Sequence, residues 1–141
     1  MINDGLNLKG KLAISLNGQV VKEVDNIVVT TGKNYVASRM KDATATAMSH
    51  MAIGSGTTNP AASDTALETE LGRVALTSTA VSNAVVTYTA TFAAGTGTGA
   101  VTEAGILNAS SSGTLLCRTE FSVVNKGAAD SMTITWTVTV S

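Results

Sequence analysis

The C-terminal stretch, residues 131–141, alternates apolar and polar side chains so regularly that it constrains the fold more than any other part of the chain. Successive side chains of a β-strand point to opposite faces of the sheet, so this pattern predicts a half-buried strand. Trp136 is the only tryptophan, and we expect it at the centre of a small core. The apolar face carries Met132, Ile134, Trp136, Val138 and Val140, and the polar face carries Thr133, Thr135, Thr137 and Thr139.

Two environments are open to such a long, Thr-rich strand. It is either a sheet edge that a second copy of the chain covers, or a strand paired within its own sheet. A row of Thr suits both environments, because a β-branched polar residue fits an exposed pleat and also pairs with another Thr row. Of the two, we expect the strand to be paired within its own sheet.

Composition narrows the class of protein. A chain of 141 residues predicts a single domain, residues 1–141, and 44% hydrophobic residues are enough for a core. The net charge of -1, without clustered Lys or Arg, argues against a nucleic-acid partner. No apolar run is long enough to span a membrane. A surface poor in charge suits a protein packed against copies of itself or a partner, although a small uncharged monomer fits as well.

Local signals divide the first half into a hairpin, a short strand and helices. Asn17-Gly18 between two apolar runs is a strong hairpin signal, because both residues tolerate positive φ. Thr31 could cap a helix, and so could Ser63 or Asp64. The predicted elements are an extended arm within residues 1–11, strands over 9–16, 19–24, 27–29 and 48–53, helices over 33–41 and 63–71, and a turn-rich loop over 54–62.

The second half reads as β throughout. Val86, Tyr88, Ala90 and Phe92 alternate with Thr in the same way as the last strand. The predicted strands cover residues 73–81, 86–92, 101–108, 115–121 and 131–141, with loops at 93–100, 109–113 and 122–130. Many short strands with helices confined to the first half indicate a mainly β fold, an antiparallel β-sandwich or jelly-roll-like fold with one or two short helices.

No residue pattern points to a catalytic, cofactor or metal site. His50 and Cys117 are the only histidine and the only cysteine, so no intrachain disulfide is expected. A nucleophilic pair of the two is conceivable, but structural roles are favoured, with Cys117 buried among apolar neighbours. The Gly-rich segments 54–56 and 95–99 lack the Lys and Ser/Thr that end a phosphate-binding loop. We therefore expect no enzyme and no cofactor.

Charged side chains in the second half have structural explanations. Glu68 and Glu70 are predicted to lie on the solvated side of the second helix. Glu103 and Arg118 lie in strands separated by one turn, so they are expected to be cross-strand neighbours if those strands form a hairpin. Such an ion pair contributes little if it is exposed. The mildly basic first third suits contact with an acidic partner surface better than a nucleic-acid groove.

Three stretches resemble small structural proteins of tailed-phage virions. Residues 51–71 read MAIGSGTTNPAASDTALETEL, similar to an IGTGTT-PAA-DTAL-TEL segment of those proteins, and residues 91–108 read TFAAGTGTGAVTEAGILN. The ending, from Asn125-Lys126-Gly127 through residues 133–138, completes the resemblance, which covers most of residues 27–141. It implies a β-sandwich without enzymatic activity, usually oligomeric, with a trimer favoured by analogy, and it carries over no functional residue.

The expected function follows from this resemblance. Small size and the absence of a long fibrous segment favour a capsid decoration, or cement, protein, made in the host cytoplasm and bound to the major capsid protein on the exterior of the virion. Residues 1–11 would act as a clamp that folds onto a neighbour. The alternative is a tail fibre, collar or baseplate module for host attachment, with the loops at 54–62 and 95–100 carrying recognition.

Overall fold

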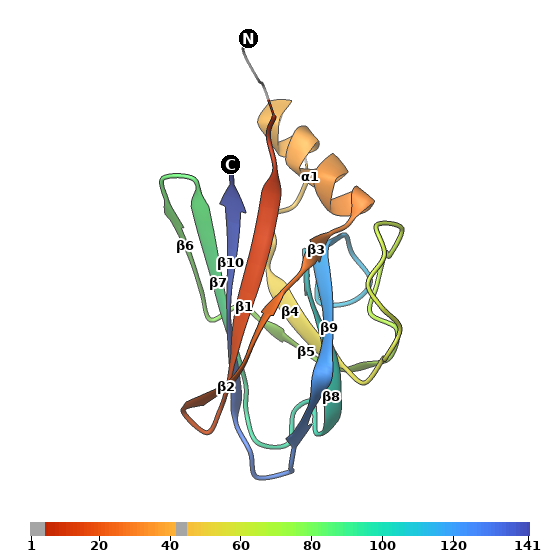
Figure 1. Cartoon of the computed structure of the whole chain (residues 1–141), viewed down its shortest axis with the longest axis vertical. Coiled ribbons are helices and arrows are strands. Elements are labelled where there is room, and N and C mark those ends of the chain that lie inside the picture. The colour runs from red at the N-terminus through yellow and green to blue at the C-terminus, as the bar shows by residue number, and fades with distance from the viewer. Residues whose placement is uncertain (1–4, 42–44) are drawn as a thin grey trace.

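Two five-stranded antiparallel sheets pack face to face in the computed structural model, which describes residues 5–41 and 45–141 (Figure 1). Sheet A has the order β2-β1-β10-β7-β6 and sheet B the order β3-β9-β8-β4-β5. This confirms the predicted mainly β sandwich with a short helix in the first half. The elements are β1 (Leu8–Leu16), β2 (Gln19–Asp25), β3 (Ile27–Val28), α1 (Thr30–Lys41), β4 (His50–Gly54), β5 (Glu70–Ala75), β6 (Ser78–Ser82), β7 (Val85–Phe92), β8 (Gly99–Leu107), β9 (Leu115–Lys126) and β10 (Met132–Val140).

Strand β10 lies at the centre of sheet A, paired with β1 on one side and β7 on the other. Its apolar residues Met132, Ile134 and Trp136 are fully buried, as the alternation predicts. Trp136 sits between Leu12 and Tyr88 in register, and its ring N–H donates to Asn26 Oδ1 at 2.7 Å. The paired arrangement is therefore confirmed, and β10 is no open edge.

The first hairpin forms at the predicted turn. Asn17 and Gly18 have φ angles of 50° and 86°, the left-handed values that a two-residue hairpin turn requires. The arm is shorter than predicted, because β1 begins at Leu8 and pairs with β10 from its first residue. Of the described residues, Gly5, Leu6 and Asn7 precede the strand, and Asn7 exchanges backbone hydrogen bonds with Ser141. Residues 1–4 of the predicted arm lie outside the described part of the chain.

Helix α1 begins earlier than predicted, at Thr30, and Thr31 does not cap it. The Thr31 hydroxyl instead donates to the Leu115 carbonyl at 2.9 Å, which ties the first turn of the helix to β9. Gly32 is buried in the same place, where a Cβ would come within 2.1 Å of the Leu116 carbonyl oxygen. The first turn of the helix therefore rests on sheet B, at the end of the sandwich where β1 begins and β10 ends (Figure 1).

The second predicted helix, over residues 63–71, is wrong. The segment consists of turns and bends until β5 begins at Glu70. Its polar groups bind elsewhere: the backbone N–H groups of Glu68 and Thr69 donate to Glu103, and the Asp64 carboxylate accepts from Ala61 N–H. The two tertiary bonds to Glu103 and the local bond at Asp64 replace the hydrogen bonds that a short helix would make.

Two further boundaries differ from the prediction. The single strand expected over residues 73–81 is two strands in different sheets, since the chain crosses between the sheets at Leu76 and Thr77, whose N–H groups bond to Ser49 and Thr89. Strand β9 continues to Lys126, so the last loop is shorter than expected. The other strand ends differ from the prediction by at most three residues, the largest difference being the start of β5 at Glu70 instead of residue 73.

The space between the sheets is filled by one main core cluster. A smaller apolar cluster lies under the loop between β4 and β5 and contains Leu67, Leu107 and Leu115. Sheet B is therefore buried on both faces, which explains why residues 101–107 are all buried although they show no strict alternation.

Candidate functional site

His50 and Cys117 do not form a pair. His50 is opposite Leu107 in the sheet and Cys117 is opposite the adjacent Ile106, so the two side chains lie on opposite faces of sheet B. Complete burial raises the pKa of the Cys117 thiol, which keeps it protonated. His50 Nδ1 contacts the hydroxyl of Ser49 at 2.8 Å. Within residues 5–41 and 45–141, no group of three or more metal-ligating side chains comes together.

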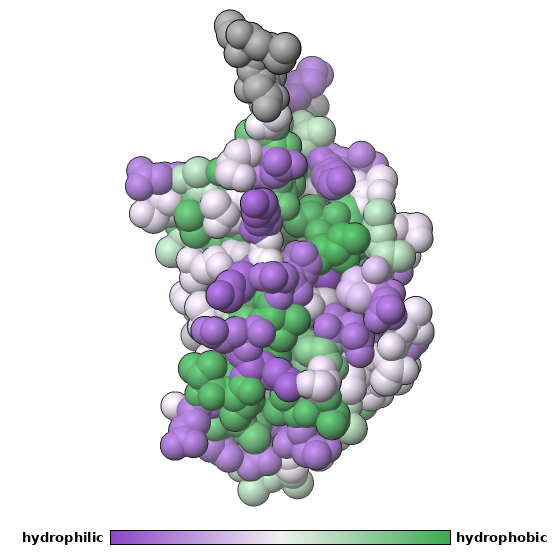
Figure 2. All heavy atoms as spheres, in the orientation of Figure 1, coloured by the Kyte–Doolittle hydropathy of each residue, from purple (hydrophilic) through white to green (hydrophobic). Residues whose placement is uncertain are grey.

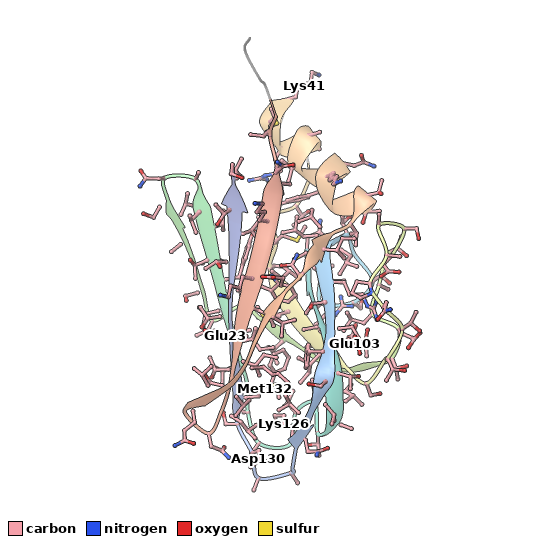
Figure 3. All side chains as sticks on the ribbon, viewed as in Figure 1. Glu23, Lys41, Glu103, Lys126, Asp130 and Met132 are labelled. Carbon is pink, nitrogen blue, oxygen red and sulfur yellow. The ribbon has the colours of Figure 1, made fainter. Side chains whose placement is uncertain are left out.

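The largest concentration of buried charge is on the face of sheet B that points away from sheet A. Glu103 in β8 is completely buried, and because the next residue, Ala104, belongs to the main core, Glu103 faces the opposite side. The loop between β4 and β5 covers it there (Figure 3). Its carboxylate accepts N–H bonds from Gly56 at 2.7 Å, Glu68 at 2.9 Å and Thr69 at 2.8 Å.

Arg118 completes this group, which we call the Glu103 cluster: Glu103, Arg118, Asp64 and the loop groups bound to them. Its Nη2 lies 3.0 Å from Glu103 Oε1, and its Nη1 lies 3.0 Å from Asp64 Oδ2. Nη2 also donates to the Thr58 carbonyl at 3.1 Å. The guanidinium therefore joins β8 and β9 to two separate points of the loop.

The Glu103 cluster holds the loop in place. Both carboxylate oxygens of Glu103 are occupied by donors. Gly56 is required at its position, because a Cβ there would lie 2.4 Å from Glu103 Oε2. The Glu103–Arg118 pair was predicted from the sequence as cross-strand neighbours. The pair forms, but diagonally, since Glu103 is opposite Glu120 and Arg118 is opposite Gly105.

Glu68 and Glu70 do not share a helix face. The Glu68 side chain turns back to the loop, where its carboxylate accepts hydrogen bonds from the Thr58 hydroxyl and from the N–H groups of Thr57 and Thr58. Glu70 forms an ion pair with Arg73 at 2.7 Å. Chiefly the hydrogen bond from the Thr58 hydroxyl, and then the two backbone N–H groups, hold the pKa of Glu68 below its ordinary value of 4.5.

Measuring the stability of the folded chain as a function of pH is expected to reveal the lowered pKa of Glu68. Because its pKa is lower in the folded chain than in the unfolded chain, its ionised form adds stability above pH 4.5, and this contribution is lost as the pH falls through the folded value. We expect Glu68→Gln to melt at a lower temperature than the parent near neutral pH and the difference to vanish in acid. Exposed Glu23 supplies the control, Glu23→Gln. A Glu68→Gln deficit that persists unchanged well below pH 4.5 would contradict this assignment.

Lys126 lies buried at the end of the sandwich away from α1, where it ties two loops together. Its side chain is 1% exposed, and its ammonium donates to the carbonyls of Ala93 at 3.0 Å and Asp130 at 2.7 Å. The Asp130 carboxylate accepts from Asn17 and from Gly127 N–H, and these bonds hold its pKa below the usual range. Lys126 and Asp130 lie together at this end in Figure 3. The sequence pattern predicted a loop over residues 122–130. The signal that could have indicated burial is that Lys126 follows the apolar Val124 by two residues, which is the spacing of side chains on one face of a strand.

An apolar groove lies at the other end, between α1 and sheet A. Two adjoining hollows of about 610 Å³ and about 330 Å³ share the side chains of Leu8, Val36, Met40 and Val140. We call this the α1 groove. Its remaining lining residues are Leu6, Asn7, Lys33, Tyr35, Ala37, Arg39, Val86, Tyr88, Leu116 and Val138.

The α1 groove combines exposed apolar surface with positive charge. Leu6 is 69% exposed and Met40 is 77% exposed, and Figure 2 shows apolar surface beside α1 and around the start of β1. Among the residues that the structure describes, the charged side chains that line the groove are Lys33 and Arg39, and none of the lining side chains is a carboxylate. Burial raises the pKa of Tyr88 to about 12, so this ring is neutral near neutral pH. The lining suits an apolar partner surface that carries acidic groups.

No match was found to a protein-family model, to a curated protein or to a solved structure. In the part of the chain described here, helices long and apolar enough to cross a bilayer are absent.

Proposed function

We propose that this chain is a capsid decoration protein of a tailed phage, which binds the assembled major-capsid shell from outside and stabilises it. The resemblance over residues 51–71 and 91–108 supports this class of protein. The observation that carries the binding role is the α1 groove, an exposed apolar surface with a basic rim at one end of the sandwich. Contiguous exposed apolar surface rimmed by charge is typical of protein–protein contact sites.

The proposed mechanism is linkage between binding and assembly. A protein that binds the assembled shell but not free capsid subunits stabilises the shell by mass action. The Glu103 cluster ties the loop between β4 and β5 to sheet B, and the Lys126 contacts tie down the loops at the end away from the groove, so binding through the α1 groove would cost little conformational entropy elsewhere in the sandwich. Leu6 and Asn7 precede β1 and line the groove, where they would contact the same capsid surface.

Binding to particles tests the groove directly. Met40→Asp places a carboxylate on the exposed apolar lining and is expected to weaken binding to undecorated particles at least tenfold, because an acidic partner surface repels it. Val123→Asp is the matched control, since Val123 is also exposed, at 49%, and lies in β9 outside the groove lining. Co-sedimentation with particles measures both variants. If both substitutions weakened particle binding equally, the α1 groove would not be the surface that binds the capsid.

Stoichiometry in purified virions tests the function itself. A band near equimolar with the major capsid protein is the expected result for a lattice component. A faint band would instead favour the alternative, a tail fibre, collar or baseplate module for host attachment. Complete absence of the chain from virions would overturn both.

A further inference from the structure

Strand β6 is an edge strand that lacks the features that keep the other edge strands from pairing with another chain. It carries no charged residue, and it is longer than the two-residue strand β3. The edges are β2 and β6 in sheet A and β3 and β5 in sheet B. Natural edge strands avoid pairing with other chains by charged residues, bulges or short length. Strand β2 carries Lys22, Glu23 and Asp25, β5 carries Glu70 and Arg73, and β3 has two residues.

All five residues of β6 are exposed, and no charged residue occurs in the chain between Arg73 and Glu103. The strand borders β7 on one side only and lies at the outer side of sheet A (Figure 1). Alternate residues of such a strand direct their N–H and C=O groups away from the sheet, where another strand can bind them.

We propose that β6 pairs antiparallel with β6 of a second copy, which joins the two A sheets across a two-fold axis. A second copy of the chain is the inferred partner because of the sequence of the strand, Ser-Thr-Ala-Val-Ser. This sequence is nearly the same in both directions, since Thr and Val side chains have the same shape. Centred on Ala80, the pairing sets Ser78 against Ser82, Thr79 against Val81 and Ala80 against itself. No charges face each other, and an isologous contact requires this kind of self-complementarity.

The side-chain faces agree with this register. Val81 and Thr79 lie opposite Val86 and Tyr88 of β7, so they share the face of sheet A that carries the core. Val81 is 75% exposed in the single chain. In the pair, each Val81 covers the Thr79 methyl group of the second copy. Ala80 faces the other side of the sheet, where its small side chain permits the close approach of two strands.

Sedimentation velocity of the full chain over a range of concentrations tests the pairing. We expect a reversible dimer, and Val81→Lys is expected to raise its dissociation constant at least tenfold by placing like charges on the two strands. Val20→Lys, on the exposed edge strand β2, is the matched control and is expected to change the constant less than twofold. A chain that stays monomeric at all concentrations, or that forms trimers unaffected by Val81→Lys, overturns the proposal.

A single introduced cysteine tests the register. Ala80→Cys sets one thiol directly opposite its copy at a spacing that a disulfide can span, so mild oxidation is expected to give a covalent dimer. The native Cys117 is fully buried and does not compete. Val20→Cys is the control. Cross-linking of Ala80→Cys no faster than that of Val20→Cys would overturn the β6 pairing, whatever surface the protein binds on a virion.

Discussion

Replacing Arg118 with Met is expected to lower the free energy of unfolding by about 3–5 kcal/mol, because it leaves the buried Glu103 carboxylate without its counter-charge. Arg118 is 2% exposed and Glu103 is fully buried, so water cannot take the place of the guanidinium. The substitution also removes the bonds to Asp64 and to the Thr58 carbonyl. The loop between β4 and β5 is thus expected to detach, and hydrogen exchange should accelerate first at the N–H groups that Glu103 binds.

Denaturant unfolding followed by circular dichroism measures this loss. Lys11→Met, which removes an exposed cation from β1, is the matched control, expected to stay within about 0.5 kcal/mol of the parent. A loss under about 1 kcal/mol for Arg118→Met would mean that the three backbone N–H groups alone stabilise the Glu103 carboxylate. Replacing Glu103 and Arg118 together by apolar residues is expected to stay destabilising, since the N–H groups of Gly56, Glu68 and Thr69 would then lose their acceptor.

Trp136→Ala is expected to cost about 3–5 kcal/mol, because it empties the centre of the core between β1 and β7. Trp136→Phe keeps most of the apolar volume and is expected to cost about 1–3 kcal/mol. The reason is the position of Asn26, whose Oδ1 accepts from the indole N–H and whose buried Nδ2 has no hydrogen-bond partner among the described residues. Loss of the indole would leave both the Oδ1 acceptor and the Nδ2 donor of Asn26 without a hydrogen bond.

Circular dichroism again serves as the readout, since both variants remove the only tryptophan. Thr135→Ala, on the exposed face of the same strand, is the control and is expected to cost less than about 1 kcal/mol. Equal losses for Trp136→Phe and Trp136→Ala would show that the hydrogen bond to Asn26, rather than the volume of the ring, dominates.

Alternation alone was enough to predict most strands and their faces. A period of two sorts side chains to the two sides of a sheet, so the burial of Trp136 and the exposure of Thr135 follow from spacing without knowledge of any partner. Asn17-Gly18 likewise predicted its own hairpin, because positive φ is a property of those residues.

Tertiary structure decided what depends on contacts between distant segments. The capping signals at Ser63 and Asp64 predicted a helix, but Glu103, far along the chain, binds the N–H groups of that loop. The same buried carboxylate holds Arg118 in a buried position under the loop between β4 and β5, and the strand pattern of the sequence does not indicate that this charged residue is buried. The α1 groove forms only where a helix from the first half meets the ends of β1, β7 and β10. Local periodicity reports on which side of an element is buried, whereas a groove or a buried ion pair depends on which elements the fold brings together.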